Sequence, residues 1–246
     1  MINSIIDVFN DYFEMVPAVS DELKNEVYKL RYQVYCIETG FENPDNHPDE
    51  MEHDEYDRHS LHYLIRHRKS GDYTATTRLI LPDAENPEKL FPLEKFSRIY
   101  NQNLLSSVSR TNLAEASRFC ISKVFRRRKN DFNILTSVDS DWPEEQSQQT
   151  QQIHGTSCHI TLALVACLIR MSRENNIHYW YAILDPNLKR FFSTLGINFA
   201  EIGPLIDLHG KQKPYIIKVD DLLSDVAKKD SSYWDLLTNK GQYWRV

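Results

Sequence analysis

Apolar residues recur at helical spacing in two segments near the start of the chain. Residues 4–13 place four of them on one side, namely Ile5, Val8, Phe9 and Tyr12. Residues 21–38 repeat the pattern after Ser20, a residue that favours helix starts. The apolar face of this second segment consists of Leu23, Val27, Leu30, Val34 and Ile37. We therefore predict two helices, with a short strand between them at 12–19 that Pro17 interrupts.

Runs of β-branched and aromatic residues predict the strands. Residues 61–66 and 73–81 flank a turn at 69–72 and form a hairpin. Further strands are expected at 113–124, 179–184, 199–202 and 215–219. Helices are expected at 93–101, from Thr156 or Ser157 to about residue 175, and at 187–195, which Asp185-Pro186 opens and Gly196 closes.

This order of elements predicts an α/β protein in which helices cover a mixed sheet. We expect one domain over residues 1–220. Its segment 139–152 is polar and rich in glutamine, which is typical of a mobile insertion. Residues 221–246 mix polar and aromatic side chains, and the pattern assigns no structure to this tail.

Composition narrows the class of protein. The 246 residues carry a formal net charge of -6, which does not favour binding of nucleic acid. The four cysteines form no C-x-x-C pair and fit a reduced compartment. No signal peptide is evident, and the most apolar run, 160–169, is too short to cross a bilayer. We expect a soluble, cytoplasmic protein without a transmembrane segment.

An acidic segment is the first candidate site. Residues 42–57 hold eight carboxylates and no Lys or Arg. One interpretation is a solvated loop. In the other, Asp54 and Asp57 line a polar pocket and pair with arginines from amphipathic or apolar segments, namely Arg31, Arg78 and Arg118. An unpaired guanidinium in such segments would be costly, which favours pairing.

Glu115 is the candidate for proton transfer. It lies in a predicted strand between Ala114 and Ala116, and a buried carboxylate there would serve as a general base. The alternative is a structural salt bridge to an arginine. Glu115 and Arg118 are three residues apart, so in a regular strand they face opposite sides. A shared site would require a β-bulge.

Two further groups of residues are candidates for binding. The run Arg126, Arg127, Arg128 and Lys129 follows the strand that holds Glu115. It is either a solvated turn or a contact for phosphate or an acidic protein. His59 and His62 have an H-x-x-H spacing but no evident third ligand, so no metal site is predicted.

Four motifs in order resemble a known family. Arg31 with Tyr35 and Phe41, Glu52-x-Asp54-x-Tyr56-Asp57, Thr77-Arg78-Leu79, and Glu115-x-Ser117-Arg118-Phe119 are similar to motifs of the acyl-homoserine-lactone (autoinducer) synthases and the long-chain N-acyl amino acid synthases. Tyr35 and Phe41 depart from the Phe and Trp of that pattern. Both groups belong to the GNAT-like acyltransferases. The resemblance covers roughly residues 20–200.

The distal sequence refines the resemblance. Leu184-Asp185-Pro186, Gly196-Ile197-x-Phe199, and Ile202-Gly203-Pro204 with His209-Gly210 look more like the acyltransferases associated with PEP-CTERM/exosortase systems. The length of the chain and the 139–152 insertion also exceed those of compact autoinducer synthases. An amino acid or similar amine is therefore favoured over S-adenosylmethionine as acceptor.

The resemblance implies a GNAT fold, with a mostly antiparallel central sheet and helices on both faces. It implies an N-acyltransferase in which an acyl carrier protein or CoA presents the acyl group as a phosphopantetheine thioester, without a tightly bound cofactor. Glu115 would act as base. Arg31, Asp54, Asp57, Arg78, Arg118 and Phe119 would frame the acceptor, and residues 126–129 would attract the carrier protein. The alternatives are an autoinducer synthase that uses S-adenosylmethionine and a non-catalytic module that binds the carrier protein.

Overall fold

A computed structural model describes residues 4–100, 108–123, 150–208 and 210–244 of the chain. Within them the strands form one eight-stranded sheet in the order β1-β2-β3-β4-β5-β8-β6, and β7 pairs with β8. The strands are β1 (Phe13–Pro17), β2 (Ser60–His67), β3 (Tyr73–Ile80), β4 (Leu113–Ile121), β5 (Tyr179–Leu184), β6 (Ala200–Glu201), β7 (Ile206–Asp207) and β8 (Lys211–Lys218). All neighbours are antiparallel except β4 and β5. The predicted α/β class with a mostly antiparallel sheet is confirmed.

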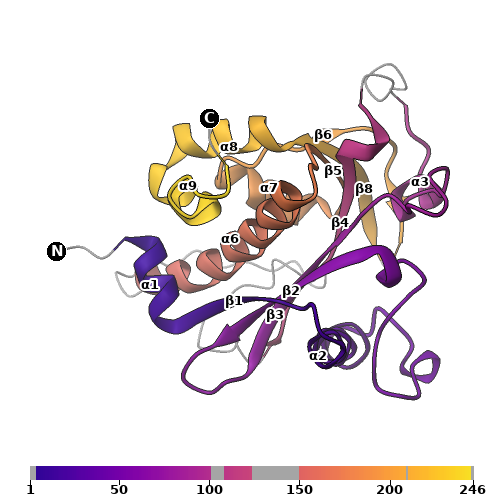
Figure 1. Ribbon diagram of the computed structural model, residues 1–246, viewed down its shortest axis with the longest axis horizontal. Coiled ribbons are helices and arrows are strands. Elements are labelled where there is room, and N and C mark those ends of the chain that lie inside the picture. The colour runs from indigo at the N-terminus through magenta and orange to yellow at the C-terminus, as the bar shows by residue number, and fades with distance from the viewer. Residues whose placement is uncertain (1–3, 101–107, 124–149, 209, 245–246) are drawn as a thin grey trace.

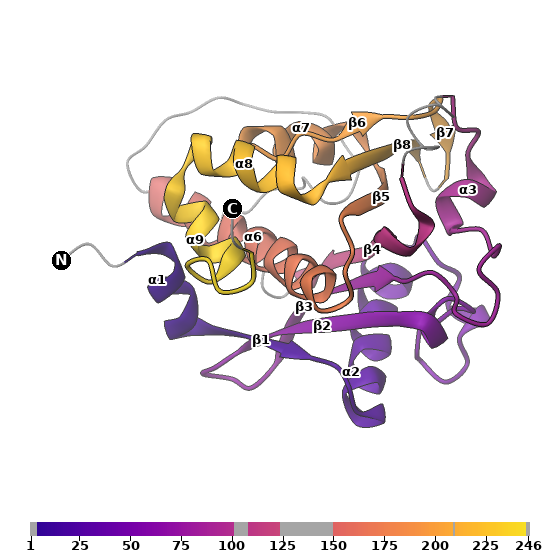
Figure 2. The ribbon, with the colours of Figure 1, turned by 45° about the horizontal axis from the view of Figure 1, so that its top comes forward.

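Helices cover both faces of this sheet (Figure 1). One face packs against α1 (Ile5–Tyr12), α6 (Thr150–Glu174), α7 (Pro186–Thr194), α8 (Val219–Lys229) and α9 (Ser231–Thr238). We call this the α6 face. The other face packs against α2 (Asp21–Tyr32) and α3 (Pro92–Phe96), and we call it the α2 face. Figure 2 shows α2 below β1 and β2, with α6, α8 and α9 above them.

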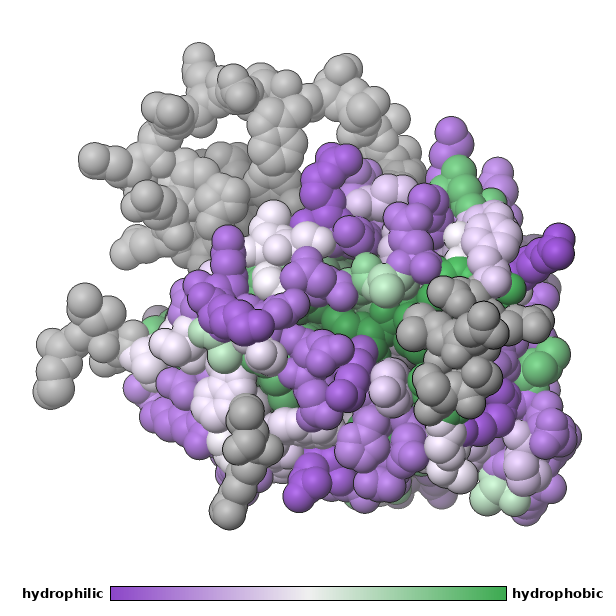
Figure 3. All heavy atoms as spheres, turned by 90° about the horizontal axis from the view of Figure 1, so that it is seen from above, coloured by the Kyte–Doolittle hydropathy of each residue, from purple (hydrophilic) through white to green (hydrophobic). Residues whose placement is uncertain are grey.

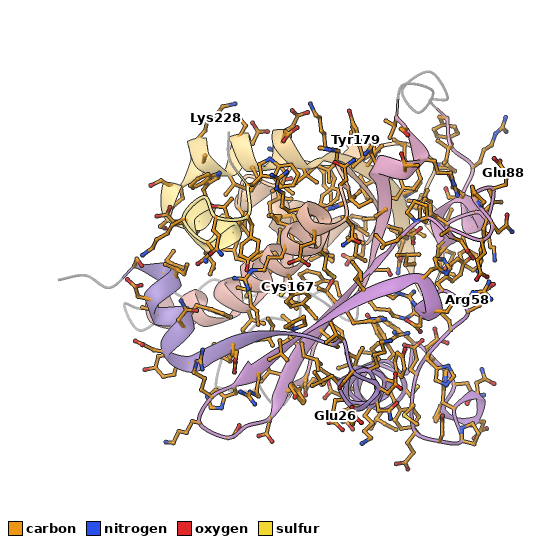
Figure 4. All side chains as sticks on the ribbon, viewed as in Figure 1. Glu26, Arg58, Glu88, Cys167, Tyr179 and Lys228 are labelled. Carbon is orange, nitrogen blue, oxygen red and sulfur yellow. The ribbon has the colours of Figure 1, made fainter. Side chains whose placement is uncertain are left out.

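The main core lies between α6 and the sheet. Its central turns are apolar on nearly every side, so residues from 160 to 171 are almost all buried. Cys167 of α6 is fully buried (Figure 4). Continuous apolarity of this kind is typical of a helix surrounded by protein. No helix in the described parts of the chain combines the length and apolarity needed to cross a membrane.

Several predicted boundaries are corrected. The predicted helix 21–38 ends as an α-helix at Tyr32 and continues as the π-helix η1 (Gln33–Glu38). The wider π turn rotates the buried face, so Cys36 is buried and Ile37 is 54% exposed. The helix predicted at 93–101 is only α3, because the chain is extended from Ser97. Helix α6 begins at residue 150, so neither Thr156 nor Ser157 starts it.

The C-terminal stretch, which the sequence pattern left without structure, forms α8 and α9. Apolar residues from both helices lie in the main core, among them Leu222, Val226 and Leu236. Trp244 closes this packing, because its indole N–H donates to Asp220 at 2.7 Å. Most of the proposed insertion at 139–152 lies outside the described residues.

Candidate active site

A bulge in β4 sets the geometry of the site. Between Thr76 and Arg78 the register of β3 against β4 shifts by one residue, so that Arg118 and Phe119 together oppose Thr77. Arg118 adopts a left-handed backbone with φ of 48°. This is the bulge without which Glu115 and Arg118 could not share one face of the sheet.

The bulge sorts the side chains of β4 between the two faces. Glu115, Ser117 and Arg118 point to the α2 face, where the Nε of Arg78 donates to Ser117 at 3.0 Å. Ala116 and Phe119 point to the α6 face and line an apolar cavity. A regular strand would have sent Arg118 into that apolar layer.

An ion-pair network joins the acidic loop to α2. The Nε of Arg31 lies 2.5 Å from Glu52, and its Nη1 lies 2.8 Å from Asp57. The Arg31 side chain is fully buried, and those of Glu52 and Asp57 are nearly so. Buried guanidinium and carboxylate groups require such pairing, and the network fixes the loop against the helix.

The strand arginines complete this network. The Nη1 of Arg78 donates to Asp54 at 2.7 Å and to Asp57 at 2.8 Å. Arg118 binds Glu52 through two nitrogens, and its Nη2 also lies 3.4 Å from Asp54. The predicted pairing with the three arginines is therefore confirmed for Asp54 and Asp57, whereas Asp45, Asp49, Glu50 and Glu55 of the same loop are exposed, as in the solvated-loop interpretation.

Exposure divides the network into a frame and an open end. The side chains of Arg31, Arg78 and Asp57 are no more than 5% exposed. Those of Arg118 and Asp54 are 26% and 28% exposed. A small molecule can therefore reach Arg118 and Asp54, and also Glu42, which lies 3.9 Å from Arg118 and is 29% exposed. The buried members of the network hold these side chains in place.

The protonation states follow from these contacts. Burial disfavours the charge on Glu52, but the guanidiniums of Arg31 and Arg118 outweigh it and lower its pKa to about 2. Asp57 is likewise buried, and Arg31 with Arg78 holds its pKa well below the ordinary value. Burial and the nearby Arg31 lower the pKa of His62 to about 3. The network therefore consists of charged carboxylates beside a neutral imidazole at neutral pH.

Glu115 lies apart from these pairs. Its side chain is on the α2 face with the residue only 2% exposed, and Oε2 accepts a 2.8 Å hydrogen bond from the backbone N–H of Leu93. Among the described residues, no arginine or lysine nitrogen lies within salt-bridge distance of it, so the salt-bridge alternative finds no support. Burial raises the pKa of Glu115 to about 8, against the opposing Leu93 N–H and Arg78. A carboxyl group with this pKa can take up and release a proton near neutral pH.

Strands β4 and β5 separate directly beyond Glu115. Their parallel pairing comprises only Leu113 with Tyr179, Ala114 with Trp180, and Glu115 with Tyr181. Beyond that point the apolar cavity lies between them on the α6 face. Its lining is Ala116, Phe119, Val165, Leu168, Trp180, Ala182, Leu184, Phe192, Ile197 and Phe199. The side chain of Phe119 thus belongs to the cavity, across the sheet from the ion-pair network.

Other candidate residues fall outside this centre. Residues 126–129 lie outside the described parts of the chain. His62 lies 3.5 Å from Asp57, whereas His59 lies beside Asp83. In the described segments, no three His, Cys, Asp or Glu side chains are grouped as metal ligands.

Sequence reasoning missed two contributors to the site. Glu52 joins Arg31 to Arg118, although only the aspartates of its motif were assigned a role. The ring of Tyr35 lies 5.5 Å from the Arg118 guanidinium carbon, which it supports by a cation–π contact. The position of both within the quoted motifs was the available signal.

The chain is similar to proteins of known family and known structure. Residues 30–135 match the family described as acetyltransferase (GNAT) domain. The curated proteins contain no match to the chain. Among solved structures, TofI in a ternary complex with an inhibitor and MTA is 14% identical with a TM-score of 0.56, over 89% of this chain and 95% of TofI.

Two further structures are similar at comparable levels. BjaI, a CoA-dependent acyl-homoserine lactone synthase solved with SAM and isopentyl-CoA, is 14% identical with a TM-score of 0.55, over 93% of this chain and 88% of BjaI. FeeM, an N-acyl amino acid synthase from uncultured soil microbes, is 13% identical with a TM-score of 0.50, over 89% of this chain and 97% of FeeM. Residues 30–135 are therefore similar to an acetyltransferase (GNAT) domain, and the chain has, over most of its length, the fold seen in TofI, BjaI and FeeM.

Proposed function

We propose that the protein is an N-acyltransferase that moves a fatty acyl group from a phosphopantetheine thioester to the amine of an amino acid or similar small acceptor. The observation that carries this proposal is the separation of β4 from β5 at Glu115. An apolar cavity lies at this fork on one face, and an accessible cation and anion lie on the other. A base between a place for an acyl chain and a place for a polar acceptor suits acyl transfer.

The proposed reaction needs no covalent enzyme intermediate. The acceptor nitrogen attacks the thioester carbon while Glu115, directly or through a water, takes the proton from that nitrogen. The C–N bond forms, the C–S bond breaks, and the thiolate leaves to be protonated. Backbone N–H groups of β4 beyond the last β5 pair would stabilise the oxyanion. Placing both reactants in one fork supplies much of the rate.

The open end of the ion-pair network suits a zwitterionic acceptor. A carboxylate of the acceptor would bind Arg118, and its amine would lie near Asp54. Arg31, Arg78 and Asp57 would act as the frame, because they are buried and already paired. An arginine such as Arg118 suits the binding of an acceptor carboxylate, since a guanidinium is planar, always charged and rich in N–H donors.

The cavity on the α6 face is the proposed place for the acyl chain. Its lining is entirely apolar, but its volume is only about 30 Å³, roughly room for two water molecules. Entry of a chain therefore requires the rings of Phe119, Phe192 and Phe199 to move apart. From above, the mostly hydrophilic surface exposes a hydrophobic strip in a hollow (Figure 3).

We extend the proposal to the acyl donor and to the place of the protein in the cell. Residues 126–129 would attract the acidic surface of an acyl carrier protein, a contact that salt would weaken. Acyl-CoA is the other candidate donor. The cytoplasmic location and the association with PEP-CTERM/exosortase systems rest on the sequence alone.

One experiment tests the proposal. The purified protein is incubated with acyl carrier protein thioester or acyl-CoA, together with an amino acid mixture or S-adenosylmethionine, and products are identified by mass. We expect an N-acyl amino acid. An acyl-homoserine lactone would indicate the autoinducer alternative. Binding of the donor without any product would indicate the non-catalytic alternative.

A further inference from the structure

Helix α3 covers the carboxylate of Glu115. The backbone N–H of Leu93, in its first turn, donates to Glu115 at 2.8 Å, and the side chain of Leu93 is fully buried. The helix has only five residues, Pro92–Phe96. So short a helix is not stable by itself, and contacts from elsewhere must hold it in place.

Arg110 supplies several of those contacts, alongside the ion pair between Lys95 and Glu55 and the hydrogen bond from the Tyr56 hydroxyl to the Leu90 carbonyl. It lies in the short helix η4 (Arg110–Asn112) directly before β4. Its Nη1 and Nη2 bind the two carboxylate oxygens of Glu94 at 2.9 and 3.0 Å, and Nη2 also donates to the carbonyl of Lys89. The guanidinium carbon lies 4.6 Å from the centre of the Phe91 ring. Arg110 therefore contacts both α3, through Glu94, and the residues before it, Lys89 and Phe91.

The contacts of Arg110 extend through Glu94 and Phe91 to Tyr181, the residue opposite Glu115. The carboxylate of Glu94 accepts a 2.8 Å hydrogen bond from the N–H of Phe91, which fixes the start of α3. The Phe91 ring packs edge-on against Tyr181 with 6.0 Å between ring centres. Tyr181 is the partner of Glu115 across the β4–β5 ladder. One arginine thus holds the cover of Glu115 against both strands.

We propose that Arg110 is a positioning residue, which holds α3 closed over Glu115 so that this carboxylate stays dry and keeps its hydrogen bond to Leu93. The inference rests on the proposed role of Glu115 as base. Arg110 acts through Glu94 and Phe91 and touches no reacting atom.

The charges around Glu115 determine what a loosened α3 would do. The titratable groups that influence it come from five elements, namely Arg78 of β3, Arg118 of β4, Tyr181 of β5, Glu94 of α3 and Tyr56 of the acidic loop. Arg78 and Arg118 are paired with Glu52, Asp54 and Asp57, none of which belongs to α3, so we expect these pairs to persist when α3 moves. Burial is the largest influence on the pKa of Glu115 and exceeds that of the Leu93 hydrogen bond. Access of water should therefore lower this pKa toward that of an ordinary glutamate.

The test measures the protonation of Glu115 directly. Infrared spectra of protein labelled with ¹³C-glutamate are titrated, and the band of Glu115 is assigned by its loss in E115Q. We expect R110Q to lower the pKa of Glu115 from about 8 toward the ordinary value. The acid limb of the pH–rate profile should move with it. Removal of a nearby positive charge alone would raise the pKa, so a fall reports the opening of α3.

Two variants complete the experiment. R58Q is the matched control, because Arg58 is also an arginine paired with one carboxylate but its side chain is 67% exposed. It should leave Glu115 unchanged. R110K keeps the charge without the two-pronged contact and should shift the pKa part of the way. If R110Q does not fold, the pKa of Glu115 in R110K tests the inference instead.

An unchanged pKa of Glu115 in folded R110Q or R110K would overturn the inference. The infrared titration does not depend on turnover. If the wild-type protein made no product with any donor and acceptor, the proposed function would fail while the role of Arg110 could still be decided.

Discussion

The Nη1 of Arg31 lies 2.8 Å from Oδ1 of Asp57, and both side chains are sealed from solvent. Asp57 also accepts a hydrogen bond from Arg78, so one carboxylate pairs with two buried guanidiniums. D57N should therefore lower the free energy of unfolding by about 3–5 kcal/mol, because two buried guanidiniums each lose one of their two carboxylate partners. Urea unfolding followed by circular dichroism measures this. E26Q, which removes an exposed pair with Lys29, should change stability by less than about 0.5 kcal/mol. Equal effects of the two substitutions would refute the assigned role of the network.

The network also predicts acid sensitivity. Glu52 and Asp57 have folded-state pKa values below those of the unfolded chain, with Glu52 at about 2. Their stabilising contribution is present above the unfolded values near 4 and is lost as the pH falls through the folded values. Stability should thus fall steeply between about pH 4 and pH 2. A plot of unfolding free energy against pH should be flatter in D57N, and an unchanged slope would contradict the prediction.

Glu115 predicts the opposite trend in stability. Its folded pKa of about 8 exceeds that of the unfolded chain, so the protein loses stability as the pH rises from about 4 to 8. E115Q should remove this loss and be more stable than the wild type at pH 9. It should also lower kcat by about 10²- to 10⁴-fold, as expected for a general base. A fully active E115Q would exclude Glu115 as the base.

Arg118 is predicted to act on the acceptor rather than on the donor. R118Q should raise the KM for the acceptor at least about tenfold, which corresponds to one charged hydrogen bond. The KM for the acyl donor should stay near its wild-type value. Initial rates at varied concentrations of each substrate separate the two, with R58Q as the matched arginine control. A change confined to the donor KM would move the acceptor site elsewhere.

The cavity predicts selection of acyl chains. A182V adds two methyl carbons to the lining and should shift preference toward shorter chains, measured by competition between thioesters of different length. A163V is the control, because Ala163 is also buried in the core but does not line the cavity. Each substitution should cost about 1–3 kcal/mol of stability through overpacking. If both variants altered chain preference equally, the cavity would not be the acyl site.

Much of the fold could be predicted from the sequence. Strand β5 has the predicted bounds, and α7 begins at Pro186 after the cap Asp185 and is followed by Gly196 with φ of 86°. These boundaries depend on local chemistry such as Asp-Pro and a left-handed glycine. The π-helix after α2 could not be predicted, because it depends on where η1 packs rather than on spacing. Helix α8 could have been predicted, because Val219, Leu222, Leu223 and Val226 recur at helical spacing, and this signal was missed.

The candidate site divides in the same way. The pairing of Asp54 and Asp57 with arginines followed from the cost of burying charge. The spacing of Glu115 and Arg118 showed only that a shared site would need a bulge. The cover over Glu115 could not be predicted, since α3 and Arg110 meet only in three dimensions. The membership of Phe119 in the apolar cavity also depends on the bulge, which reverses the face of every residue beyond it.

The contact between α1 and α9 has a consequence for the order of folding. These helices pack together although almost the whole chain lies between them, and Lys240 just after α9 lies 3.8 Å from Asp7 of α1. During synthesis α1 leaves the ribosome long before α9, which forms part of the surface that receives it. Such distant contacts slow folding. The apolar side of the amphipathic α1 therefore stays exposed until α9 has been made. We expect chaperones that hold nascent chains to bind this side.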